Sequence, residues 1–345
     1  MFSKLLKAWK ILNNDIAIDM GSANTLIMVK GKEGIQLSEP SIVAMKNEDG
    51  KKSVVAIGED AKKLIGRTPI GYEAISPIKH GIIINDAHAE IMMRNFINKV
   101  SNSEFLRPSP RVFLSIPSSS TEVERRIFKE VLLDSGAREV LLVESPMAAA
   151  LGAGLPIESE KASMIVNIGA NITEIGIIAL KTPILTKTIK VGGQNLDEAL
   201  INFIKRNDSV KIGLETAEKV KKHMATALED EASEDNVMTI RGQFLQSGLP
   251  VKLDINKKDV LISMSETFQL LIAGIIDVLG DLPPEVLSDL YESGIVLAGG
   301  SANISGLDKI IEKFTGLKTT VANEPSLCVI KGMGIVLDMY SKKEL

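Results

Sequence analysis

The sequence predicts an α/β fold made of two similar halves, and the first observation behind this is an internal repeat. Residues 16–29 read IAIDMGSANTLIMV and residues 164–177 read MIVNIGANITEIGI. Three pairs match at one constant offset: Asp19 with Asn167, Gly21 with Gly169, and Thr25 with Thr173. Both stretches place apolar residues on either side of a short glycine-containing turn, which is typical of a β-hairpin. Such a repeat in a chain of 345 residues predicts two similar domains facing each other.

The second observation is the alternation of strands and helices between the two hairpins. Residues 111–117 (RVFLSIP) have the composition of a buried strand. The helical stretch that follows has Thr121 and Glu124 spaced as a capping box. A second strand at 139–145 leads directly into the alanine-rich segment PMAAALGAG, with Pro146 in the first turn of the predicted helix. Strand–helix–strand–helix units of this kind build parallel sheets.

Ligands of parallel sheets bind outside the carboxyl ends of the strands, where Asp19, Ser145 and Asn167 are expected to lie. A third glycine turn occurs in GIVLAGGSANISGLDKI (294–310), which reads as a strand, a turn and the start of a helix. The N–H groups at such a helix start suit the phosphates, or the ribose and base, of a nucleotide. Residues 190–258 are polar and are predicted to be helical, with the acidic run EDEASED as a solvated loop.

Composition excludes several other classes of protein. The chain is 24% charged and 45% hydrophobic, as an ordinary globular protein is. A net charge of −4 without a basic block argues against nucleic acid as a partner. Cys328 is the single cysteine, which excludes an intramolecular disulfide, suits a reducing cytoplasm, and is expected to be a small buried hydrophobe. The three histidines lack metal-ligand spacing, and there is no apolar run of 18 residues.

The first twelve residues, MFSKLLKAWKIL, predict an amphipathic helix. Phe2, Leu5, Leu6 and Trp9 recur at the spacing of one helix face, while the remaining positions carry lysines and no acid. This pattern is typical of a helix lying in a membrane interface. A helix docked on the protein's own core, or a frayed terminus, remains the alternative.

Several motifs together resemble the MreB family of bacterial actins. In chain order they are DMGSANT, VERRIF, PMAAALGAGLP, TAEKVKKH, GIVLAGGS and KGMGIVLD, and the resemblance covers residues 1–340. It implies an actin-like α/β fold, shared more distantly with sugar kinases and chaperone ATPases, with two similar domains of four subdomains around a nucleotide cleft. The implied subdomains are IA (1–42, with the amphipathic helix 1–12, 80–160 and 330–345), IB (43–79), IIA (161–190 and 259–329) and IIB (191–258).

The resemblance also implies ATP with Mg²⁺ as the ligand and indicates the residues that bind it. Asp19 would hold the metal through water, with no direct protein ligand to the metal. The nucleotide-binding residues are Asp19, Gly21, Ser22, Ala23 and Asn24 in the first hairpin, Gly169, Ala170, Asn171 and Ile172 in the second, Glu218, Lys219, Val220 and Lys221 in TAEKVKKH, and Gly299, Gly300, Ser301 and Ala302 in the third turn.

Members of this family form antiparallel double protofilaments on the inner face of the cell membrane, where they organise cell-wall synthesis and rod shape. The resemblance therefore implies a cytoplasmic, membrane-associated protein. Its implied partners are further copies of the chain, the anionic inner membrane, RodZ, MreC, MreD and the cell-wall synthesis machinery; a second MreB paralogue is left open. Phe105 and Leu106 match a family loop that touches the membrane together with the N-terminal helix.

This chain departs from the family at the residues that organise water. Where the family has Glu-Glu-Pro, the chain has Glu144-Ser145-Pro146, and the second glutamate is the one credited with positioning the attacking water. Asn167 stands where the second hairpin of the family has an aspartate. Glu144 is a poor substitute for the missing carboxylate, because adjacent strand residues point to opposite faces.

The second hairpin also departs at its turn, which in the family reads Gly-Gly-Gly-Thr. Ala170, Asn171 and Ile172 add side chains where main-chain N–H groups approach a polyphosphate, and Ser301 stands at a usual glycine. If position 170 requires left-handed backbone geometry, alanine costs roughly 1–2 kcal/mol there. The first hairpin departs only at Ser22, where threonine is usual.

Together these features predict a divergent MreB-type filament protein with weak or absent ATPase activity and lowered nucleotide affinity. One alternative is an ordinary ATP-hydrolysing member of the family that tolerates these residues. A more remote one is a small-molecule kinase of the same fold, which would need a second substrate pocket.

Overall fold

The computed structural model of the chain describes residues 15–48, 51–101 and 109–342. The chain divides into two compact units. Unit 1 comprises Met1–Leu155 and Leu327–Leu345, and unit 2 comprises Pro156–Ser326. The finer boundaries of the four subdomains stay a prediction.

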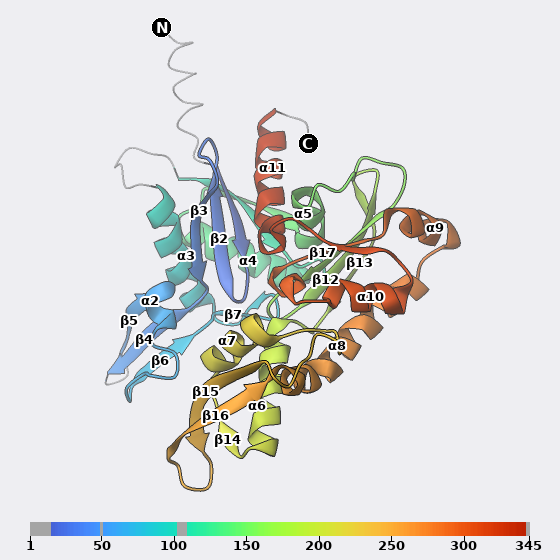
Figure 1. Cartoon of the computed structure of the whole chain (residues 1–345). Coiled ribbons are helices and arrows are strands. Elements are labelled where there is room, and N and C mark those ends of the chain that lie inside the picture. Colours follow the sequence, from blue (N-terminus) through green and yellow to red (C-terminus); the bar gives the residue numbers. More distant parts are fainter. Residues whose placement is uncertain (1–14, 49–50, 102–108, 343–345) are drawn as a thin grey trace. The chain divides into compact units, whose positions relative to one another are not determined.

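The core of unit 1 is a five-stranded sheet in the order β10-β9-β1-β2-β3, of which Figure 1 labels β2 and β3. β1, β2 and β3 form an antiparallel meander, whereas β9 pairs with β1, and β10 with β9, in parallel. The strands are β1 (Ile16–Met20), β2 (Asn24–Val29), β3 (Ile35–Pro40), β9 (Arg111–Ile116) and β10 (Glu139–Glu144). The accompanying helices are α3 (Asp86–Ser101), α4 (Glu122–Asp134), α5 (Ser145–Gly152) and α11 (Cys328–Lys342). The predicted capping box of Thr121 and Glu124 is present at the start of α4.

Unit 2 contains a sheet of the same design, in the order β13-β12-β11-β17-β18. Its first three strands are again an antiparallel meander, and β17 and β18 again add in parallel. The strands are β11 (Ser163–Ile168), β12 (Thr173–Ala179), β13 (Thr182–Ile189), β17 (Ile295–Ala298) and β18 (Thr319–Val321). The accompanying helices are α8 (Lys257–Gly280), α9 (Pro284–Ser293) and α10 (Leu307–Thr315), with short 3₁₀ turns at Gly300–Asn303 (η1) and Pro325–Leu327 (η2).

The strand register confirms that the two hairpins are repeats of each other. In the first, Asp19 pairs with Leu26. In the second, Asn167 pairs with Glu174, which is the residue expected from the constant offset. A chance likeness of two short glycine turns would not preserve this register through both strands.

Each unit also carries a smaller sheet. In unit 1 it is β5-β4-β6, made of β4 (Val43–Glu48), β5 (Lys51–Ile57) and β6 (Tyr72–Ile75). The short helix α2 (Glu59–Lys62) follows β5, and β7 (Ile78–Lys79) pairs with β8 (Ile82–Ile83).

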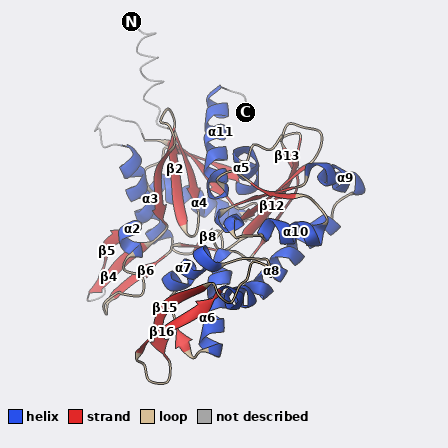
Figure 2. Ribbon diagram, in the orientation of Figure 1, coloured by secondary structure: helices blue, strands red, loops and turns tan. Residues whose placement is uncertain are grey.

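In unit 2 the smaller sheet corrects the prediction that residues 190–258 are helical. α6 (Gly193–Asn207) and α7 (Leu214–Met224) are present, but β14 (Val210–Lys211), β15 (Val237–Phe244) and β16 (Pro250–Asn256) form a three-stranded sheet (Figure 2). The alternation of apolar and polar residues in β16 (PVKLDIN) is typical of a half-buried strand, and the prediction overlooked it. The acidic run is a loop, as predicted, but it is not merely solvated: Glu231 accepts hydrogen bonds from Ser305 and Thr226.

α8 is apolar enough to qualify, by length and composition alone, as a membrane-crossing helix, although no uninterrupted apolar run of 18 residues was found in the sequence. Its buried residues recur three or four positions apart and belong to the core of unit 2. Core helices share this composition, so α8 carries no argument for a membrane span. Cys328, as expected, is fully buried.

α5 and α11 cross in unit 1 at two glycines. A Cβ atom on Gly332 would lie 1.8 Å from the carbonyl oxygen of Ala148, and one on Gly152 would lie 1.8 Å from that of Cys328. Contacts this close leave no room for any side chain. Because α5 begins at Ser145, this crossing fixes one of the candidate site residues.

We expect Gly332→Ala to lower the free energy of unfolding by about 1–3 kcal/mol, because the added methyl group forces the two helices apart. Gly280→Ala is the matched control, since a Cβ there meets no atom within 4 Å. Urea denaturation of both variants measures the difference. Equal stability of the two would contradict the tight crossing.

Candidate nucleotide site

The turn after β1 is closed by its own backbone. The N–H of Gly21 donates to the carbonyl of Asn24 at 3.1 Å, and a Cβ on Gly21 would lie 2.8 Å from that oxygen. Ser41 holds the turn from outside, because its N–H donates to Ala23 and its hydroxyl to Gly21. Within the described residues, the N–H groups of Ser22 and Ala23 meet no acceptor. Successive free N–H groups in a turn form a site for an anion such as phosphate.

Asp19 lies at the carboxyl end of β1, beside this turn. The hydroxyl of Ser115 on β9 donates to its Oδ1 at 2.9 Å. Although part of the side chain reaches solvent, burial raises the pKa of Asp19 to about 6, and the Ser115 hydrogen bond lowers it only in part. A carboxylate that is costly to ionise alone is well suited to a nearby cation, which fits the expected hydrated Mg²⁺.

Sequence reasoning missed Ser115, although its position offered a signal. It is the penultimate residue of a parallel strand that neighbours β1, and Asp19 pairs with it in register. Polar residues at the carboxyl ends of neighbouring parallel strands converge on one site.

The turn after β11 has the same construction. The N–H of Gly169 donates to the carbonyl of Ile172 at 2.9 Å, as that of Gly21 does to Asn24. Here the start of α6 holds the turn, because Gly193 and Gln194 donate to the carbonyls of Gly169 and Ala170. The N–H groups of Ala170 and Asn171 have no acceptor in the described parts of the chain. The second hairpin therefore keeps the main-chain features of an anion site.

The condition under which strain is expected at Ala170, a left-handed backbone, is not met in the structure. Neither Ala170 nor Asn171 is among the residues with positive φ, so the left-handed cost does not arise. The Asn171 side chain is buried, and its amide donates to the side-chain oxygen of Gln194 on α6. Ile172 is buried as well. Ala170, Asn171 and Ile172 thus fit the turn, and the side chains of Asn171 and Ile172 are buried within unit 2.

Neither position expected to organise water carries a carboxylate. Ser145 is buried, and its hydroxyl donates to the carbonyl of Ile116 at 2.9 Å. Its single proton is therefore already committed to the backbone of β9. Glu144 forms an ion pair with Arg125 at 3.0 Å, which supports the view that it does not replace the missing glutamate. Asn167 is 9% exposed, and its amide has no partner among the described residues.

The third glycine turn begins at Gly299, where φ is +86°. A Cβ there would lie 2.3 Å from the carbonyl oxygen of Ile168, so only glycine fits over the end of β11. The chain continues as the 3₁₀ turn η1, and α10 starts at Leu307, so 294–310 holds a strand, a turn and a helix start as predicted. Ser301 donates to the carbonyl of Gly169 at 3.3 Å and so joins this turn to the second hairpin. Ala302 is buried.

On α7, Lys221 is the predicted residue that the structure brings to the second hairpin. Its amine donates to the carbonyl of Gly193 and to Asp197, both at 2.7 Å. Sequence reasoning missed Asp197, which is buried; burial raises its pKa to about 6, against the lowering effect of Lys221. Glu218 pairs with Lys222, and its charge also contributes to raising the pKa of Asp197. Lys219 is exposed, and Val220 lies in the core.

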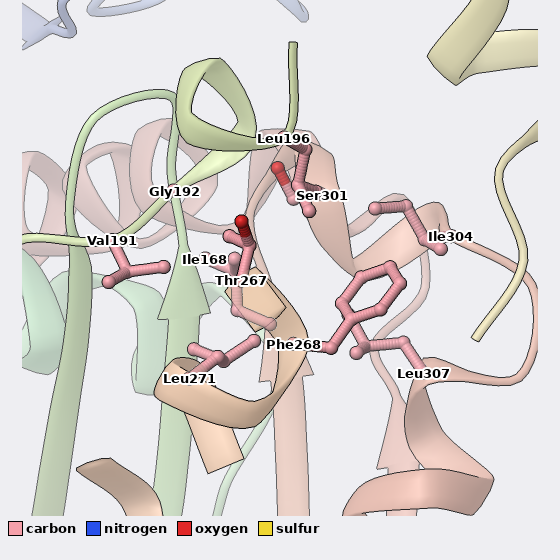
Figure 3. Close-up of a pocket in the computed structure, with 10 residues that line it drawn as sticks. All are labelled: Ile168, Val191, Gly192, Leu196, Thr267, Phe268, Leu271, Ser301, Ile304 and Leu307. Carbon is pink, nitrogen blue, oxygen red and sulfur yellow. The ribbon is translucent and has the colours of Figure 1, made fainter. Parts of the chain in front are cut away.

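A cavity of about 10 Å³ lies behind the second hairpin, between α6, α8 and η1 (Figure 3). Phe268, Ile304 and Leu307 form its apolar side, and the hydroxyls of Ser301 and Thr267 are its polar groups. It holds at most a single water molecule. This cavity belongs to the packing of unit 2 and is too small for a nucleotide.

The residues expected at a membrane, Phe2, Leu5, Leu6, Trp9, Phe105 and Leu106, lie outside the described residues.

The comparisons with known proteins agree with the fold described above. The MreB/Mbl protein family model matches residues 13–345. The cell shape-determining protein MreB of Escherichia coli K12 is 41% identical over 339 residues, which are 97% of this chain and 96% of that protein. The cell shape-determining protein Mbl of Bacillus subtilis is 38% identical over 328 residues, 95% of this chain and 97% of that protein.

Solved structures match the whole architecture. Crystal structures of MreB5 of Spiroplasma citri, bound to ADP and to AMPPNP, give a TM-score of 0.89 at 30% identity, covering 96% of this chain and 98% of theirs. The MamK double helical filament gives a TM-score of 0.75 at 19% identity, covering 94% of this chain and 99% of that one, which shows the fold alone.

We expect Asp19→Asn to stabilise the nucleotide-free protein at pH 7.5 by about 1–3 kcal/mol. The folded state raises this pKa from 3.8 to about 6, so ionisation costs stability above pH 6 and nothing below about pH 4. Asparagine keeps an acceptor for Ser115 without that cost. Unfolding free energies at pH 4 and 7.5 measure the effect, with the exposed Asp235→Asn as control. A gain that is the same at both pH values would refute the assigned cause.

Proposed function

The chain belongs to the MreB/Mbl family and has the actin-like fold, and we propose that it is a cytoskeletal filament protein that binds ATP but hydrolyses it weakly or not at all. The relatives named cell shape-determining proteins support the cytoskeletal role. The observation that carries the rest is Ser145, a buried hydroxyl already bonded to Ile116, together with an amide at Asn167.

Nucleotide binding is supported by the two equivalent turns. Each is closed by a glycine N–H, and each has two N–H groups without an acceptor in the described residues. The Spiroplasma citri relatives were solved with ADP and with AMPPNP. Asp19 would hold hydrated Mg²⁺, which supplies positive charge to the phosphates. These contacts come mostly from the main chain, so they survive the side-chain departures of the second hairpin.

ATP hydrolysis needs more than nucleotide binding, because the attacking water must be held in line with the terminal phosphate and must lose a proton. A serine whose proton is donated elsewhere and a neutral amide supply neither a base nor a negative charge. Groups of this kind are worth roughly 10²–10⁴-fold in rate. Glu144 is held by Arg125 and does not supply the missing charge.

We further propose that the protein acts at the cytoplasmic face of the inner membrane, as a double filament of its own copies. The amphipathic pattern of residues 2–9 supports membrane contact. RodZ, MreC, MreD and the cell-wall synthesis machinery are the partners to test first, followed by a second MreB paralogue that co-assembles with it.

The competing function is an ordinary ATP-hydrolysing MreB, and the intact first hairpin with Asp19 is the observation in its favour. The two proposals differ only in phosphate release. A small-molecule kinase has no specific observation behind it.

We expect the purified protein to release phosphate from ATP at background rate, whether or not filaments form, while ATP still binds. Steady-state phosphate release and equilibrium nucleotide binding on one preparation measure both. Turnover comparable with that of the Escherichia coli relative would establish the competing function.

Reverting the lost residues tests how they act together. We expect Ser145→Glu alone to restore little, partly because Ile116 then loses its hydrogen bond. Ala170→Gly, Asn171→Gly and Ile172→Thr should chiefly change nucleotide affinity. Adding Ser145→Glu and Asn167→Asp to these three should restore hydrolysis by more than the product of the separate effects, since residues acting as one unit are not additive.

Single-turnover phosphate release and nucleotide affinity, measured for each of these variants, separate chemistry from binding. Full activity from Ser145→Glu alone would mean that the second hairpin is competent as it stands.

The membrane part has its own test. Deleting residues 2–10, or changing Phe2, Leu5 and Trp9 to serine, should abolish co-sedimentation with anionic liposomes. Burial of each large apolar side chain is worth about 1.5–3 kcal/mol. An unchanged urea midpoint controls for folding. Continued sedimentation of the deletion variant would exclude this segment as the anchor.

A further inference from the structure

A groove of about 570 Å³ lies on unit 1, between the end of β2 and the outer side of α11. β2 and α11 lie next to each other in this unit (Figure 1). Met28 and Val29 come from β2, and Ile335 and Leu337 from α11. Val29 and Leu337 are buried, so Met28 and Ile335, the latter 40% exposed, supply the accessible apolar surface of the groove. Charged residues and glycines form the rest of its lining. The groove therefore offers a small apolar surface between charged groups, which an amphipathic element could cover.

The chain itself passes the end of this groove. Asp15 precedes β1, and its carbonyl accepts from the N–H of Lys30, a groove residue, at 2.9 Å. The Asp15 carboxylate also lies 4.0 Å from the Lys30 amine. Any segment that precedes Asp15 therefore starts beside the groove.

We propose that the groove binds the chain's own N-terminal segment, residues 2–12, through the apolar face of Phe2, Leu5, Leu6 and Trp9. A helix of that length spans about 17 Å. Asn13 and Asn14 are enough to connect it to Asp15 at the groove's end. Because the segment is tethered, its effective concentration at the groove is on the order of millimolar.

Charge supports this occupant over a neutral or acidic one. Glu33 and Asp338 line the groove, and neither pairs with a described cation. Three lysines also line the groove, and none of them is free: Lys30 lies near Asp15, Lys32 donates to the carbonyl of Val100, and Lys331 has a partner of its own. The segment carries Lys4, Lys7 and Lys10 and no acid, so its polar side complements the two free carboxylates.

Docking in the groove competes with membrane binding, and this step rests on the proposal that the segment binds the membrane. The groove and the membrane bury the same apolar face, so the segment occupies one or the other. The apparent membrane affinity then equals the affinity of the free segment multiplied by the fraction of chains whose segment is undocked. If about nine-tenths are docked, release of the segment raises membrane affinity about tenfold. The groove thus regulates when the protein binds the membrane.

Trp9 makes the proposal directly measurable, because it is the single tryptophan of the chain. Acrylamide quenching of its fluorescence, in lipid-free protein at high dilution, reports whether the segment is shielded. The reference is a synthetic peptide of residues 1–14. We expect Trp9 of the full chain to be strongly shielded relative to the peptide.

Ile335→Glu places a charge in the groove and should restore quenching to the level of the peptide. It should also raise affinity for anionic liposomes by up to about tenfold. Ile184→Glu is the matched control, because Ile184 is similarly exposed, at 47%, but lies on β13 of unit 2. Asp338→Lys, at an exposed position that does not threaten folding, should shift both readouts in the same direction as Ile335→Glu.

Quenching of Trp9 in the full chain equal to that of the peptide would overturn the proposal. So would shielding that disappears on dilution, because the occupant would then be a second copy. Shielding without liposome binding would support the groove and refute the membrane role. Liposome binding by a chain whose Trp9 is fully accessible in solution would refute docking in the groove and support the membrane role.

Discussion

Each of the two candidate anion-binding turns depends on the same backbone constraint, the closed turn at the carboxyl end of β1 in unit 1 and of β11 in unit 2. In each, a glycine N–H donates to the carbonyl three residues later, at 3.1 Å after Gly21 and 2.9 Å after Gly169. A Cβ would lie 2.8 Å from that carbonyl oxygen at Gly21 and 3.0 Å from it at Gly169, so both positions favour glycine. Closing the turn this way leaves the next two N–H groups without a described acceptor, an arrangement that suits an anion.

The two turns have the same main-chain geometry. Their side chains differ, and with them the chemistry that each turn can support. Asp19 keeps a carboxylate whose pKa is raised by burial, which costs stability in the absence of a cation. Asn167 avoids that cost at the equivalent position, and with it the negative charge. Hydrogen bonds from Asn171 and Ser301 tie the second turn into unit 2. The second turn is therefore held by protein contacts and carries a neutral amide where the first has a carboxylate.

Sequence reasoning predicted the features that are determined by residues close together in the chain. The hairpin repeat, the capping box at Thr121 and the helix starting near Pro146 each depend on residues close in sequence, and each is present. Ser115 and Asp197 were missed because their roles come from contacts across elements, which leave no local pattern. Sequence alone left open whether Ala170 needs a left-handed backbone, since backbone angles follow from the whole turn and not from the residue type alone; the structure shows that it does not. In 190–258 the strands were missed although β16 alternates Val251, Leu253 and Ile255 with polar residues, which is the pattern of a half-buried strand.

The central claim is that ATP stays intact in the site, and the nucleotide held by filaments tests it most directly. Filaments assembled with ATP are collected by centrifugation, quenched in acid, and their bound nucleotide is separated by chromatography. We expect the pelleted nucleotide to remain ATP over many minutes, with ADP no higher than in protein-free ATP. A pellet that contains mainly ADP would contradict the claim and show that Ser145 and Asn167 leave hydrolysis intact.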